Sequence, residues 1–262
     1  VIIMGPDMYQ ALPFWQQAAI VCPLIFLGGF VDAITGGGGL ITLPAYLFAG
    51  LPVHFALGTN KLSSCIGTAL TTARYARAGF IPWRLACLCV AASLMGSNLG
   101  AHLALFLNDR IFKFLMLFLL PVTALYVLKG RALVRQRPTL PQARTVLTSA
   151  AIAFALGAYD GFYGPGAGTF MLLLLAAAAH LSLNTANGVA KSINMASNLA
   201  ALTVFLINGR VLFPLGLLAA CFGLAGNYLG ARSFEHGGAR AVKPIMLTVL
   251  AIFFVSLLRD LF

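Results

Sequence analysis

The stretch Gly29-Phe-Val-Asp32-Ala-Ile-Thr-Gly36-Gly-Gly-Gly39 interrupts an apolar segment with glycine, and a related stretch returns as Gly157-Ala-Tyr-Asp160-Gly-Phe-Tyr-Gly164-Pro-Gly166-Ala-Gly168. In both copies an aspartate comes shortly before the glycines, and the two aspartates lie 128 residues apart (160 − 32). Glycine and proline runs of this kind do not remain in the interior of a stable helix. Each stretch therefore predicts a helix that breaks within apolar surroundings.

The rest of the chain repeats in the same order. Leu57-Gly58-Thr-Asn-Lys61 matches Gly188-Val-Ala-Lys191, and Gly96-Ser-Asn-Leu-Gly100-Ala101 matches Gly226-Asn-Tyr-Leu-Gly230-Ala231, both at an offset of 130 residues (191 − 61). We therefore predict a first repeat over 1–130, a basic linker over 131–144 and a second repeat over 145–262. Many secondary transporters are built from two such halves, neither of which encloses a pathway alone.

The composition indicates a membrane protein. Only 9% of the residues are charged and 60% are hydrophobic, whereas about 25% of an ordinary soluble domain is charged. A membrane-spanning helix needs roughly 20 apolar residues, and two further apolar stretches, 40–50 and 169–179, are too short for that and predict broken or re-entrant helices. The predicted fold is an all-α polytopic membrane protein with about 8–10 segments, whose longer candidates are 14–34, 56–78, 84–107, 111–129, 145–163, 185–207, 211–231 and 243–260.

The net charge of +11 reflects topology and not nucleic-acid binding, because the basic residues gather at helix ends and in the linker. The positive-inside rule places that linker in the cytoplasm. If the short stretches do not change sides, the repeats are parallel, and if they do, the repeats are inverted. The count of basic residues differs little between the two, but helices broken at corresponding positions are typical of inverted repeats, which we therefore favour.

Two lysines carry the chemical hypothesis. Lys61, Ser64 and Thr68 share one helical face, as do Lys191, Asn194 and Asn198, because residues three, four and seven apart lie on the same side of a helix. Ammonium groups beside hydroxyl and amide donors suit an anion with several acceptor oxygens. The alternative is that each lysine extends to the membrane interface, or pairs with an aspartate for folding alone.

Asp32 and Asp160 are the acids that fall inside apolar helices, next to the breaks. An ionisable residue in the membrane costs roughly 2.5–3.5 kcal/mol on insertion scales, so each is a functional candidate. Either aspartate organises its glycine turn and pairs with a lysine, or it carries a coupling ion. The break glycines, predicted to supply hinges and backbone N–H donors, are Gly36, Gly37, Gly38, Gly39, Gly164, Gly166 and Gly168.

The sequence gives little support to an enzyme. It contains no catalytic triad pattern, no helical His-x-x-x-His pair and no two carboxylates on one helical face, and the four-glycine run lacks the Gly-Lys-Ser/Thr of a phosphate loop. We expect no enzymatic activity, no cofactor, no metal site and no nucleic-acid partner.

At these residues the chain resembles the TauE/SafE family, also called TSUP, and within it the YfcA-like branch. The resemblance rests on Gly28 to Gly39 with Leu43-Pro44, Ala56-Leu-Gly-Thr-Asn-Lys61, Tyr159 to Gly166 and Tyr228-Leu-Gly-Ala231. It implies a multi-pass transporter of the bacterial inner membrane that moves anions, often sulfur-containing ones such as sulfite or sulfonates. Gly188-Val-Ala-Lys191 departs from Gly58-Thr-Asn-Lys61, so an asymmetric site is expected.

The sequence thus predicts a secondary transporter that moves a small anion by alternating access, with its site between the repeats. The alternatives are a passive anion channel on the same fold and a membrane sensor or accessory protein that does not transport. The expected partners are the anion, the lipid bilayer and a coupling proton or cation, while a homo-oligomer is left open. The predicted substrate-binding residues are Asn60, Lys61, Ser64, Thr68, Lys191, Asn194 and Asn198.

Overall fold

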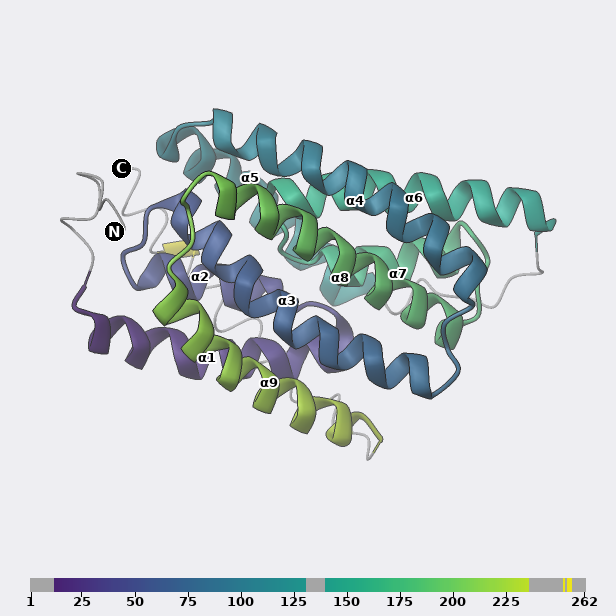
Figure 1. The fold of residues 1–262 in the computed structure, drawn as a ribbon, viewed down its shortest axis with the longest axis horizontal. Coiled ribbons are helices and arrows are strands. Elements are labelled where there is room, and N and C mark those ends of the chain that lie inside the picture. Colours follow the sequence, from purple (N-terminus) through teal and green to yellow (C-terminus); the bar gives the residue numbers. More distant parts are fainter. Residues whose placement is uncertain (1–11, 131–139, 236–251, 253, 256–262) are drawn as a thin grey trace.

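The computed structural model describes residues 12–130, 140–235, 252 and 254–255, and the elements it forms there are α-helices (Figure 1). This confirms the predicted all-α class. The helices are α1 (Phe14–Thr35), α2 (Gly39–Phe48), α3 (Val53–Arg77), α4 (Trp83–Phe106), α5 (Asp109–Gly130), α6 (Gln142–Phe162), α7 (Ala167–Ala177), α8 (Leu183–Ile207) and α9 (Phe213–Glu235).

Proline sets the beginning of several helices. Pro13, Pro52, Pro82 and Pro141 immediately precede α1, α3, α4 and α6. Proline has a fixed φ and no N–H group. It therefore suits the beginning of a helix, where backbone N–H groups have no helical acceptor, better than the helix interior, where it removes a backbone hydrogen bond. α8 begins differently, since the Ser182 hydroxyl accepts a hydrogen bond from the Thr185 backbone N–H at 3.3 Å.

Both predicted helix breaks are confirmed. α1 ends at Thr35, and the next residue, Gly36, has a φ of 78° and donates its N–H to the Asp32 carbonyl at 2.8 Å. In the later copy α6 ends at Phe162, and Gly164 has a φ of 95°. Residues with side chains rarely adopt such positive φ values, so glycine allows the chain to leave α1 and α6 and to begin the short helices α2 and α7.

The helices before and after the linker correspond in order and length. α1 and α6 contain 22 and 21 residues, and the short α2 and α7 contain 10 and 11. α3 and α8 contain 25 each, and α4 and α9 contain 24 and 23. The predicted counterpart of α5, over 243–260, lies outside the described residues except at 252 and 254–255.

The long helices pack in pairs that cross between the two halves. α4 lies beside α6 along one edge of the molecule and α1 beside α9 along the other, with α3 and α8 between them (Figure 1). A methyl group at Gly96 or Gly100 would overlap carbonyl oxygens of α6, and one at Gly226 or Gly230 would overlap those of α1. Glycine therefore permits the close backbone approach of both pairs.

These contacts fix the helix directions. α1 and α9 run the same way, since Gly226 packs against Phe26 and Gly230 against Phe30. Corresponding contacts of Gly96 with Phe154 and of Gly100 with Ala158 show that α4 and α6 are also parallel to each other.

The two central helices connect these pairs. α3 and α8 are antiparallel, because Lys61 contacts Asn198 while Thr72 contacts Lys191. α4 runs parallel to α8, with Ser93 bonded to Ile193 and Ser97 to Ser197, and α9 runs parallel to α3. Corresponding helices of the two halves therefore run in opposite directions, which is the inverted arrangement.

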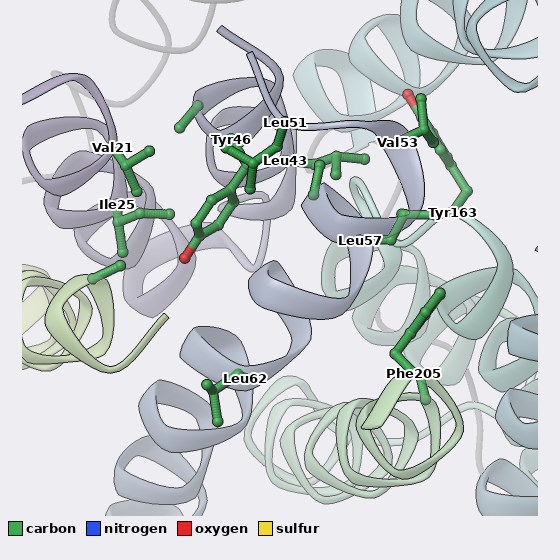
Figure 2. Close-up of a cluster of buried hydrophobic side chains, with 14 of the residues drawn as sticks. Val21, Ile25, Leu43, Tyr46, Leu51, Val53, Leu57, Leu62, Tyr163 and Phe205 are labelled. Atoms are coloured by element: carbon green, nitrogen blue, oxygen red, sulfur yellow. The ribbon is translucent and has the colours of Figure 1, made fainter. Parts of the chain in front are cut away.

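The apolar core surrounds the short helices. Its larger cluster joins α1, α2, α3, α4, α5, α8 and α9 and contains Leu43, Tyr46, Leu57 and Phe205 (Figure 2). A second cluster around Met171 joins α4, α6, α7 and α8. Because α2 and α7 are each enclosed by longer helices, the glycine breaks that precede them lie inside the protein, where their backbone is shielded from lipid.

Five helices in the described part of the chain are long and apolar enough to span a membrane, namely α1, α4, α6, α8 and α9. The predicted spans 56–78 and 111–129 correspond to α3 and α5. α3 is long enough to span a membrane but is not apolar enough to be among the five. In α3 the reason is its polar content, which includes Lys61, Asn60, Ser63, Thr68 and Thr71. These residues are buried inside the protein, so α3 does not need an apolar surface toward lipid.

Candidate functional site

A partly open cavity lies where the two helix breaks meet the central helices. With its mouth it contains about 590 Å³ of empty space. α1, α2, α3, α6, α8 and α9 contribute to its wall, so both halves of the chain line it. The polar and charged lining residues are Asp32, Thr42, Asn60, Lys61, Ser63, Ser64, Thr68, Asp160, Asn194, Asn198 and Asn227.

The two glycine breaks form one side of this cavity and touch each other. A methyl group at Gly36 would lie 2.9 Å from the Gly168 carbonyl carbon, and one at Gly39 would lie 3.1 Å from the Pro165 Cα atom. Gly36, Gly38, Gly39, Gly164, Gly166 and Gly168 line the cavity, whereas the predicted Gly37 is not among its lining residues. The breaks therefore bring backbone from both halves to one place.

Lys61 reaches the cavity from α3 and pairs with an aspartate of the other half. Its Nζ atom lies 2.9 Å from Asp160 Oδ1, and the two side chains are only 2% and 4% exposed. The same ammonium group donates to Asn198 Oδ1 at 3.0 Å, and the Ser197 hydroxyl donates to Asp160 Oδ2. The buried Asp160 carboxylate thus accepts from two donors, the Lys61 ammonium group and the Ser197 hydroxyl. Two of the three Lys61 N–H groups have protein acceptors.

Lys191 of α8 forms the corresponding pair with the first half. Its Nζ atom lies 2.8 Å from Asp32 Oδ2 and also donates to the Asp32 backbone carbonyl at 3.1 Å. That carbonyl is the one that accepts from Gly36, so Lys191 bonds the last turn of α1 at its break. Lys191 is buried but is not among the cavity-lining residues, while Asp32 is.

The ion pairs therefore cross between the halves, and the two sites differ. Each lysine is neutralised by the aspartate of the other half, as one of the alternative sequence interpretations anticipated. Only the Lys61 pair presents its ammonium group to the cavity. This asymmetry agrees with the difference between Gly58-Thr-Asn-Lys61 and Gly188-Val-Ala-Lys191.

The remaining predicted polar residues, Asn60, Ser64, Thr68, Asn194 and Asn198, are all in the cavity wall. Their hydrogen bonds limit what each one offers. The Thr68 hydroxyl donates to the Ser64 carbonyl at 2.8 Å, so it presents lone pairs to the cavity. Asn198 gives one amide N–H to Asn194 Oδ1 at 3.3 Å, which leaves its second N–H as a donor.

The sequence interpretation missed Thr42, Ser63 and Asn227 of the cavity wall. Thr42 and Asn227 each carry a buried oxygen that has no hydrogen-bond partner among the described residues, as does Asn60. Asn227 is the amide of the Gly226-Asn-Tyr-Leu-Gly230 stretch, and its Nδ2 donates to the Gly223 carbonyl at 2.9 Å. A lone amide within an apolar helix is the signal that would have identified it.

No group of three or more His, Cys, Asp or Glu side chains in the described residues is arranged to hold a metal ion. The charged side chains that line the cavity are Lys61, Asp160 and Asp32, which lie there together with amides, hydroxyls and backbone. Such a set can exchange ion pairs, hydrogen-bond a small polar solute and bind or release a proton.

Comparison with known proteins decides the family. The family model described as "Sulfite exporter TauE/SafE" matches residues 21–257. The chain belongs to the TauE/SafE family. The match includes both helix breaks, both ion pairs and the whole cavity wall, so these features lie within the TauE/SafE region of the chain.

Three TauE/SafE relatives are similar over nearly their full length. "Probable membrane transporter protein ORF9" of Sinorhizobium sp is 35% identical over 90% of each chain. A Haemophilus influenzae protein described as a membrane transporter is 32% identical over 92% of this chain and 94% of its own, and YfcA of Escherichia coli K12 is 31% identical over 89% and 87%. No solved structure matches the chain. With five apolar spanning-length helices, this TauE/SafE protein is a multi-pass membrane protein.

Proposed function

We propose that the protein is a secondary transporter that carries a small anion across the bacterial inner membrane by alternating access. The observation that carries this proposal is the Lys61 ammonium group, which is almost completely buried and faces a cavity lined by both inverted halves. A charge held at such a site is costly and marks an ion or substrate pathway in membrane proteins. The two predicted repeats, 1–130 and 145–262, are the bodies that would move relative to each other.

In this proposal the anion binds beside Lys61. Asn194 and the second N–H of Asn198 would donate to its oxygens, and backbone N–H groups at the glycine breaks would add further donors. Lys191 would contact the anion only when its pair with Asp32 opens, as one half moves against the other. The name of the family supports a sulfur-containing anion, such as sulfite or a sulfonate.

Flux measurements on purified protein in liposomes test the proposal. We expect saturable uptake of at least one anion from a panel of sulfite, sulfate, thiosulfate, methanesulfonate and acetate, and acceleration when the same anion is present on the far side. Acceleration of that kind distinguishes a carrier from a passive channel. Lys61→Met should abolish the flux, whereas Arg84→Ala, an exposed position at the start of α4 outside the cavity, should leave it intact. Flux without saturation would favour the channel, and absence of flux for every anion would favour a sensor.

A further inference from the structure

We infer that Asp160 takes up the coupling proton: one proton binds its carboxylate when an anion binds beside Lys61. This inference rests on the proposed anion site. The starting observation is that Lys61 and Asp160 already neutralise each other at 2.9 Å, with both side chains buried. An anion that approached this pair would be attracted by Lys61 and repelled about equally by Asp160, because screening by water is weak at a buried site.

Protonation of Asp160 removes that repulsion without moving a helix. A proton on Oδ1 replaces the ion pair by a neutral carboxyl group, while Oδ2 keeps its hydrogen bond from the Ser197 hydroxyl. The Lys61 ammonium group retains Asn198 Oδ1 as a partner and gains a free N–H that can be donated to the anion. The proton neutralises the negative charge of Asp160, and a monovalent anion supplies one negative charge in its place. The buried site is therefore neutral in both states.

Lys61 is the charged side chain paired with Asp160, and the other groups named around this carboxylate are thiol, phenol, hydroxyl and amide side chains. α3 contributes Lys61 and, one turn later, Cys65, and α6 itself contributes Tyr159 and Tyr163. The Tyr159 hydroxyl donates to the Pro165 carbonyl at 2.7 Å. α4 and α8 face this region with the neutral residues Ser93, Ser97, Ser197 and Asn198, and α7 contains no titratable residue.

Asp32, the other aspartate of the cavity wall, does not fit the same role. Its partner Lys191 is not a lining residue, so protonation of Asp32 would not present a free ammonium group to the cavity. Lys191 would also remain bonded to the Asp32 backbone carbonyl. The Asp32 pair therefore holds the break after α1, and the Asp160 pair couples the proton to the anion.

Calorimetric binding to the full chain in detergent tests the coupling. The probe is methanesulfonate, which carries a single negative charge near neutral pH, so any proton taken up must bind to the protein. Titrations in buffers of different ionisation enthalpy should show uptake of about one proton per anion, and the apparent Kd should rise about tenfold per pH unit where Asp160 is ionised. Asp160→Asn, which imitates the neutral carboxyl, should bind the probe with no proton uptake and with little dependence on pH.

Two controls separate the outcomes. Asp109→Asn, at the start of α5 and outside the cavity wall, should keep the uptake of about one proton. Asp32→Asn tests whether the other aspartate of the cavity wall takes up the proton instead. Binding without proton uptake in the unmodified protein, or uptake that is lost in Asp32→Asn and retained in Asp160→Asn, would overturn the inference and leave the anion site standing. Failure of methanesulfonate to bind at any pH would overturn the anion site itself. If Asp160→Asn does not fold, the unmodified protein and Asp32→Asn still decide.

Discussion

Lys61 and Asp160 form a buried ion pair of 2.9 Å between α3 and α6, which belong to different halves of the chain. The equivalent residues Lys191 and Asp32 form the reciprocal pair at 2.8 Å. Each ion pair therefore ties one half to the other. A change in either pair affects both the packing of the halves and the charge that a solute meets.

Lys61→Met should destabilise the protein strongly, by about 3–5 kcal/mol, because it leaves the Asp160 carboxylate buried without its counter-charge. The double variant Lys61→Met/Asp160→Asn removes the second charge as well and should recover most of the loss. Thermal unfolding in detergent measures the stability, and calorimetry measures anion binding. We expect the double variant to fold but not to bind anion, and recovery of binding would show that Lys61 does not contact it.

Lys191→Ala should destabilise the protein less than Lys61→Met, by about 1–3 kcal/mol. It removes two hydrogen bonds to Asp32, but the Asp32 side chain is 16% exposed and can still contact water. The loss should be accompanied by faster hydrogen exchange at Gly36, whose N–H bonds the same Asp32 carbonyl. Asp32→Asn, which keeps the backbone bond of Lys191, serves as the comparison. Equal exchange at Gly36 in all three proteins would contradict a role of Lys191 in holding the break.

Gly100→Ala should weaken the contact between α4 and α6, because the added methyl group would overlap the Ala158 carbonyl oxygen. Overpacking of this kind costs about 1–3 kcal/mol. Gly223→Ala is the matched control, since its methyl group would meet only the Ile25 side chain, at 3.2 Å from Cγ2. Thermal unfolding should separate the two variants, and equal stability would mean that α4 and α6 approach less closely than described.

Asn198→Asp should reduce anion affinity about tenfold or more, because it adds a second carboxylate 3.0 Å from the Lys61 ammonium group. Asn198→Ser removes the amide without adding charge and should reduce affinity less. Calorimetry with methanesulfonate at fixed pH compares the two. A larger effect from the serine variant would indicate that hydrogen bonding and not charge determines binding at this position.

Much of the fold could be predicted because its signals are local. The breaks after Asp32 and Asp160 follow from glycine and proline, whose backbone preferences act within a few residues. The helical faces of Lys61 and Lys191 follow from the helical period alone. Local signals predicted α3 but not its environment, since its polar residues are buried by other helices and a window of hydropathy does not record which neighbours a helix has.

The sequence by itself determined the membrane class, the two helix breaks and the set of charged residues that the apolar segments contain. Only the tertiary structure decided that Lys61 pairs with Asp160 and Lys191 with Asp32, that corresponding helices run in opposite directions, and that Lys61 alone of the two lysines faces the cavity. The physical reason is that helix formation and helix ending depend on neighbouring residues. The partner of a buried charge depends instead on which helices, distant in the sequence (160 − 61 = 99 and 191 − 32 = 159 residues), can approach closely enough through glycine to enclose it.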